Sequence, residues 1–177
     1  YKYMNIYSTK FKGLKIIKVK KFSDLRGKVI KVFNKKKKYS KFNCFESYTS
    51  FSRKGAIRGL HGQIGKYSQE KLIYCLKGRA IDLAVDMRKK SKTYGQIFKK
   101  TINSKSSNAI FIPKGFVHGL LSLENETIII NFCSSPFNPK QEYGINFKSL
   151  NIDLPKLKLY VSKKDKKLPN LKKVLKK

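Results

Sequence analysis

Two short apolar segments flank a glycine in KLIYCLKGRAIDLAVDM, residues 71–87. The first runs from Lys71 to Leu76 and ends at a Lys77-Gly78-Arg79 connection. In the second, Ile81, Leu83, Val85 and Met87 alternate with Asp82, Ala84 and Asp86. Alternation with a period of two residues predicts a half-buried antiparallel strand. Two such strands joined by a short glycine turn predict a β-hairpin.

Similar segments recur along the chain. Residues 28–33 predict a strand that is followed by a basic turn at 35–38, and residues 108–112 predict one that stops at a Pro-Lys-Gly turn. Residues 127–132 predict an apolar strand. We expect helix only as a short turn, near Pro155 or in the C-terminal tail. Many short strands separated by Gly and Pro are typical of a jelly roll or barrel. Without a repeat or a linker, residues 1–177 are expected to form a single domain.

The composition fits one folded domain with a strongly basic surface. The chain has 177 residues, of which 40% are hydrophobic, enough for a core. Lys and Arg number 42 against 10 Asp and Glu, a net charge of +32 that attracts polyanions. Only five basic residues are Arg, which nucleic-acid readers favour for bidentate contacts. We therefore interpret the charge as a solvated surface and expect no specific nucleic-acid partner.

Cysteine usage indicates a reducing compartment. Cys44, Cys75 and Cys133 form no CxxC pair and their number is odd. No apolar signal segment opens the chain, and no apolar run approaches the roughly 18 residues that span a bilayer. We expect a cytoplasmic protein without a membrane partner.

The chain has two histidines, and each lies next to glycine. His61 is in AIRGLHGQ, residues 56–63, and His118 is in IPKGFVHG, residues 112–119. A single histidine is more often a packed or surface residue than a functional one. Here the scarcity of histidine and the two glycine settings favour function. Neither histidine has a second His or a Glu at ligand spacing, so the sequence predicts no metal site.

Several motifs, in order from about residue 20 to 170, carry a resemblance to a known family. They are SDLRG (23–27), RGLH (58–61), the stretch 71–95, IPKGFVHG (112–119), EYGI (142–145) and SKKD (162–165). Together they resemble the dTDP-4-dehydrorhamnose 3,5-epimerase family. The resemblance implies an all-β cupin-type jelly roll, or double-stranded β-helix, with a short, partly helical C-terminal segment. It also implies a homodimer, a nucleotide-sugar substrate, no cofactor, and a role in making sugars for lipopolysaccharide or capsule.

The resemblance assigns three catalytic residues. A proton on the carbon beside a ketone is acidic because its removal gives an enolate, and His is the usual base at neutral pH. His61 matches that base. Asp165 matches the carboxylate that binds the other ring nitrogen, and Lys71 matches the lysine that stabilises the enolate oxygen. A surface Asp and an exposed Lys are the plain alternatives for the last two.

Further residues match the sugar and diphosphate pocket. These are Arg58 and His118, and more weakly Arg26. The sequence departs from the family at other positions in this pocket. Asn131 stands where the family has the tyrosine that serves as second proton-transfer group, and a second family tyrosine is Phe137 here. A Gln and an Asn upstream of RGLH are replaced by Glu46 and Tyr48.

These departures leave several outcomes open. The protein epimerises one carbon with water or Tyr48 as the proton donor, performs the double reaction with a relocated acid, or binds the ligand without turnover. Single-site or altered epimerisation is favoured because His61, Asp165 and Lys71 are all present. Replacement of the family glutamate by Lys31 also leaves the nucleotide open. A ketoisomerase on the same scaffold is less favoured because its relatives are expected to carry two neighbouring histidines. The remaining alternative is a basic polyanion-binding module.

Overall fold

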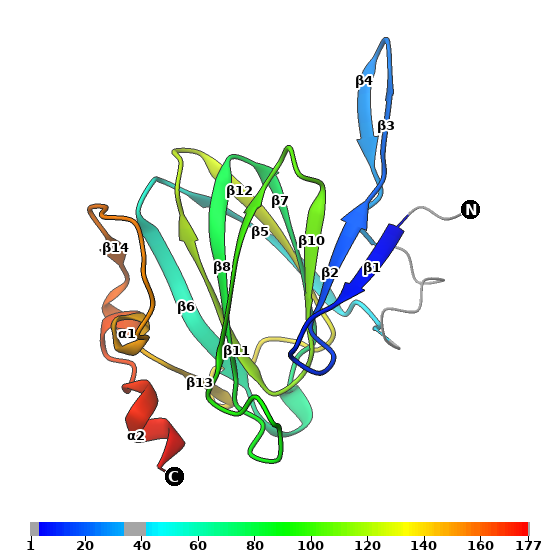
Figure 1. The fold of residues 1–177 in the computed structure, drawn as a ribbon. Coiled ribbons are helices and arrows are strands. Elements are labelled where there is room, and N and C mark those ends of the chain that lie inside the picture. Colours follow the sequence, from blue (N-terminus) through cyan, green and yellow to red (C-terminus); the bar gives the residue numbers. More distant parts are fainter. Residues whose placement is uncertain (1–3, 34–41, 177) are drawn as a thin grey trace.

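The computed structural model describes residues 4–33 and 42–176, which fold around two face-to-face β-sheets (Figure 1). The first sheet has the order β1 (Met4–Ser8), β2 (Lys15–Val19), β10 (Asn108–Ile112), β7 (Lys71–Lys77), β12 (Thr127–Cys133), β5 (Glu46–Ser52). The second has the order β13 (Glu142–Gly144), β6 (Ala56–Gln63), β11 (Phe116–Ser122), β8 (Arg79–Asp86), β9 (Ile97–Asn103), and β14 (Tyr160–Val161) pairs with β6. Apart from the parallel β14–β6 pair, the ladders in both sheets are antiparallel.

The remaining elements lie outside the two sheets. Strands β3 (Lys21–Asp24) and β4 (Gly27–Ile30) form a separate hairpin that projects away from the sandwich (Figure 1). The helical elements are η1 (Gly65–Tyr67), η2 (Phe147–Ser149), α1 (Lys163–Lys166) and α2 (Leu171–Leu175). Helices α1 and α2 confirm the expected helical turn in the C-terminal tail. Among the described helices, none is long and apolar enough to cross a membrane.

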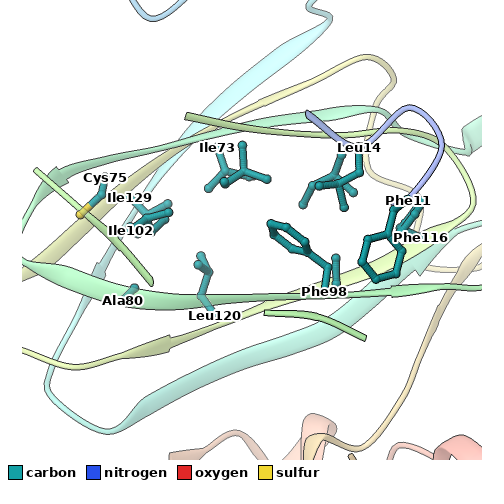
Figure 2. Packing of buried hydrophobic residues seen from close by; sticks show 13 residues of the cluster. Phe11, Leu14, Ile73, Cys75, Ala80, Phe98, Ile102, Phe116, Leu120 and Ile129 are labelled. Carbon is teal, nitrogen blue, oxygen red and sulfur yellow. The ribbon is translucent and has the colours of Figure 1, made fainter. Parts of the chain in front are cut away.

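An apolar core fills the space between the sheets. Figure 2 shows its side chains, with Ile73 and Cys75 from β7, Phe98 and Ile102 from β9, and Ile129 from β12. They alternate along their strands with residues on the opposite face, which is the period of two that the sequence showed. Each fully buried aliphatic or aromatic side chain contributes about 1.5–3 kcal/mol relative to exposure.

A second apolar layer corrects the prediction for β8. Residues 81–87 were expected to form a half-buried strand, yet every residue from Ala80 to Asp86 is buried. The inward face of β8 lines the sandwich interior, and Ile81, Leu83 and Val85 pack in a second cluster that includes Leu171. The C-terminal segment therefore covers the outer face of this sheet, where solvent was expected.

The predicted β7–β8 hairpin is wrong. Strand β7 pairs with β10 and β12, whereas β8 pairs with β11 and β9, so the two strands belong to different sheets. The chain crosses between sheets at Gly78, which has φ +74, and a Cβ there would lie 2.7 Å from Thr127 Oγ1. Gly78 thus lies at the connection between the two sheets. Such a connection and a hairpin turn both favour a glycine with positive φ, so the sequence pattern does not distinguish them.

The other predicted strands fare differently. The strand at 108–112 is confirmed as β10, and 127–132 lies within β12. The strand predicted at 28–33 is shorter, because β4 ends at Ile30. The basic turn predicted at 35–38 lies outside the described residues. No helix is found near Pro155.

Candidate functional site

One cavity of about 420 Å³ is lined by five side chains that the sequence singled out, Glu46, Tyr48, His61, Lys71 and Phe137. Its walls come from both sheets and from the C-terminal segment. Its lining residues are Glu46, Tyr48, His61, Gly62, Gln63, Gln69, Lys71, Phe137, Glu142 and Lys164. A larger hollow of about 780 Å³ lies around Arg53 and Tyr160, and no histidine lines it. The smaller cavity is therefore the candidate active site.

His61 and Asp165 are in direct contact although 104 residues separate them in the chain. The Nε2 atom of His61 lies 2.7 Å from Asp165 Oδ1. Because the carboxylate accepts the hydrogen bond, the ring proton belongs on Nε2 and Nδ1 keeps its lone pair. The His61 side chain is 27% exposed and lines the cavity, while Asp165 is buried behind it.

Local backbone contacts hold the Asp165 carboxylate in place. Helix α1 begins after Ser162, whose Oγ accepts the Asp165 N–H at 3.0 Å. The second carboxylate oxygen, Oδ2, accepts the backbone N–H of Gly59 at 3.1 Å. Gly59 has φ +104, and a Cβ there would lie 2.6 Å from the His118 carbonyl oxygen. The glycine of the RGLH motif therefore lets β6 pass close to both β11 and the carboxylate.

A second carboxylate lies beside the His61 ring. Glu142 Oε1, on β13, is 3.5 Å from His61 Nδ1, and its other oxygen forms an ion pair with Lys164. Since Glu142 lines the cavity, the Nδ1 atom lies on the cavity side of the ring. Nδ1 is thus the ring nitrogen on the cavity side, with the Glu142 carboxylate beside it.

Lys71 enters the same cavity from the first sheet. Its cross-strand neighbour on β12 is Cys133, whose own neighbour on β5 is Glu46, so the three residues form one row. Burial lowers the pKa of the Lys71 ammonium, while neighbouring groups, including the carboxylates of Glu142 and Glu46, act in the opposite direction. Burial also raises the pKa of the Cys133 thiol to about 11, with Lys71 opposing, so the thiol remains protonated at neutral pH.

Two further predicted residues line the cavity and one lies just behind it. Tyr48 on β5 and Phe137 both line the cavity. Asn131 is the direct cross-strand partner of Tyr48 and is 3% exposed, but it does not line the cavity.

Three predicted ligand residues lie elsewhere. His118 is buried next to His61 in the sheet, and its Nε2 lies 2.8 Å from Asp82 Oδ2. Arg58 donates hydrogen bonds to Ser52 Oγ and to the Phe51 carbonyl. Arg26 lies on the β3–β4 hairpin, where its side chain is 90% exposed and pairs with Asp24. None of the three lines the cavity, as far as the described residues define it.

Five lining residues were not singled out from the sequence: Gly62, Gln63, Gln69, Glu142 and Lys164. Two of them belong to motifs that were recognised, EYGI for Glu142 and SKKD for Lys164. Gln63 follows His61 by two residues on β6, so period-two geometry places both side chains on one face. Gln69 carried no signal of this kind.

Comparison with known proteins accounts for this arrangement. The model of the dTDP-4-dehydrorhamnose 3,5-epimerase family matches residues 8–173. The chain belongs to this family. It is 34% identical over 168 residues to the dTDP-4-dehydrorhamnose 3,5-epimerase of Shigella flexneri, covering 92% of this chain and 93% of that one.

Solved structures of the family agree with the fold. The epimerase from Sulfolobus tokodaii has 36% identity and a TM-score of 0.89, with 97% of each chain covered. The epimerase from Legionella pneumophila, solved in complex with dTDP-4-keto-L-rhamnose, has 32% identity and a TM-score of 0.89, covering 96% of this chain and 93% of that one. The predicted all-β cupin-type fold is confirmed, and this epimerase-family chain is an isomerase-class enzyme.

Proposed function

We propose that the protein inverts one or both of the carbons C3 and C5 of a nucleotide-linked 4-keto sugar. The observation that carries this proposal is the His61–Asp165 contact at a cavity that Lys71 enters from the facing sheet. The ligand of the Legionella structure, a dTDP-linked 4-keto sugar, supports the substrate class. The product would supply surface polysaccharides such as lipopolysaccharide or capsule.

The first step is removal of the proton beside the ketone. His61 Nδ1 takes the proton, the C–H electron pair enters the carbonyl system, and an enolate forms. Asp165 stabilises the imidazolium that results, because its carboxylate already accepts the Nε2 proton. A base placed in this way contributes about 10²–10⁴-fold to the rate.

Lys71 is proposed to stabilise the enolate oxygen. A positive charge in a poorly solvated wall interacts strongly with a charge that develops only during the reaction. The lowered pKa of Lys71 also makes its ammonium a better proton donor to that oxygen. Removal of one such donor commonly costs about 10²–10³-fold in rate.

The nucleotide can be identified by ligand stabilisation. A panel of dTDP-, GDP-, CDP- and UDP-linked 4-keto sugars is tested by thermal unfolding. A ligand at 100 times its Kd stabilises by about 2.7 kcal/mol, which raises Tm by roughly 5–11 °C for a domain of this size. We expect this shift for dTDP sugars. A shift for a different nucleotide would reassign the substrate, and steep salt-dependent binding of RNA without any sugar-nucleotide shift would favour a polyanion-binding module.

We infer that the protein is a homodimer. The β3–β4 hairpin projects from the sandwich (Figure 1), and Leu25 and Val29 on it are exposed. A lone two-stranded hairpin with exposed apolar residues is marginally stable in water. We infer that a second copy of the chain packs against these apolar residues. Light scattering should give twice the chain mass of 20.5 kDa. A monomer mass at micromolar concentration would contradict the inference.

We also propose that the protein acts in the cytoplasm. Cys44, Cys75 and Cys133 are all free thiols in the structure, as expected in a reducing compartment.

A further inference from the structure

Inversion requires two proton-transfer groups on opposite sides of the substrate carbon. A base that returns the proton it removed restores the starting configuration. His61 acts from β6 in the second sheet, so the returning proton must come from another wall of the cavity. In the proposed mechanism, Lys71 is occupied at the enolate oxygen.

Strand β5 supplies the wall that belongs to the other sheet. Its two residues in the cavity are Glu46 and Tyr48. Carboxyl groups in proteins are mostly ionised at neutral pH, and an ionised carboxylate has no proton to give. Tyr48 carries an O–H that can be transferred.

The position of Tyr48 is explained by an exchange across one strand pair. The family resemblance puts Asn131 where the family has its tyrosine and Tyr48 where the family has an asparagine. In the structure, Tyr48 and Asn131 are direct partners in the antiparallel β5–β12 ladder. Direct partners point to the same face with Cβ atoms about 4.5–5.5 Å apart. By the resemblance, the phenol and the amide have therefore exchanged positions within one cross-strand pair, which places the phenol in the cavity lining.

We propose that Tyr48 is the acid that protonates the enolate carbon on the face opposite His61, an assignment that rests on the proposed epimerase function. The phenol O–H breaks and a new C–H bond forms with inverted configuration, leaving a phenolate at Tyr48 and a proton on His61. Water then reprotonates the phenolate and accepts the His61 proton, so no further reactant is needed.

The surroundings of Tyr48 favour its neutral form. Desolvation raises the pKa of the phenol, and nearby acidic groups, among them Glu46, raise it further, while Arg58 opposes them. The hydroxyl therefore carries its proton when the enolate forms.

The test separates proton removal from inversion. The substrate is the 4-keto sugar with the largest thermal shift in the panel, beginning with dTDP-4-keto-L-rhamnose, and the reaction is followed by NMR in deuterated water. For Tyr48→Phe we expect hydrogen–deuterium exchange beside the ketone to persist within a few-fold of wild type. Inversion should fall by about 10²–10⁴-fold, the usual contribution of a positioned acid. The matched control is Tyr160→Phe, which removes a phenol outside this cavity and should change neither rate.

A second experiment exchanges the residues at positions 48 and 131 and tests whether inversion is regained. Tyr48→Asn alone should lose inversion, and Tyr48→Asn combined with Asn131→Tyr should regain most of it. Wild-type inversion by Tyr48→Phe would overturn the proposal. The proposal would also be overturned if Glu46→Gln lost inversion while Tyr48→Phe retained it. If the wild-type protein itself shows neither exchange nor inversion with any sugar of the panel, the epimerase function fails, and Tyr48 fails with it.

Discussion

Replacing His61 with alanine should abolish deuterium exchange beside the ketone and lower kcat by about 10²–10⁴-fold, the usual contribution of a general base. His61 Nδ1 is the only ring nitrogen left free by Asp165, and it lies on the cavity side. No other imidazole lines the cavity formed by the described residues. Exchange is followed by NMR in deuterated water with the nucleotide sugar that gives the largest thermal shift.

The fold of this variant should survive, because the His61 side chain is partly exposed and little apolar packing depends on it. Thermal unfolding provides this check. Added imidazole should restore part of the exchange, since a small base can enter the space that the side chain leaves. Exchange at the wild-type rate in His61→Ala would place the base elsewhere.

Replacing Asp165 with asparagine should lower kcat by about 10⁴-fold, the loss seen when an amide replaces the carboxylate that orients a catalytic imidazole. The carboxylate accepts one hydrogen bond from His61 and one from the Gly59 N–H. An amide offers only one acceptor oxygen. If that oxygen stays with Gly59, the NH2 group faces Nε2 and moves the ring proton to Nδ1, where the base is needed.

Asp153→Asn is the matched control for this variant. Asp153 lies in the same C-terminal segment and is exposed, so the same change of charge should leave kcat unaffected. The measurement is kcat by product NMR together with Tm. A kcat for Asp165→Asn close to that of wild type would show that the carboxylate does not act through His61. If the substitution lowered kcat only by unfolding the protein, Tm would fall as well.

The prediction of the strands succeeded where the pattern is local. Residues 71–76 and 108–112 alternate or run apolar between clear turn signals, and both form strands at those places. The same reasoning failed at Gly78, because a glycine turn does not reveal whether the chain folds back on its neighbour or crosses to another sheet. It failed again for β8, because its outer face is buried by Leu171, which lies far along the chain.

The candidate site was predicted only in part. The resemblance picked out His61, Lys71 and Tyr48, and the structure gathers them around one cavity. It also picked out Arg26 and His118, which the structure keeps out of that cavity. A sequence motif shows which residue is present at a position. Which residues line a cavity depends on which strands lie next to each other in the fold. Glu142, beside the His61 ring, was therefore missed even though its motif was recognised.

Local sequence determined the period-two strands, the glycines at tight positions and the scarce reactive groups. These follow from the chemistry of a few consecutive residues. Tertiary structure brings Asp165 to His61 across 104 residues, a pair that the family resemblance implied but no local pattern predicted, and it alone places Tyr48 beside Asn131. Apolar burial and backbone hydrogen bonds over the whole sandwich determine how the strands pair and where the C-terminal segment docks. These contributions come from residues far apart in the sequence, so no single stretch of the chain predicts them.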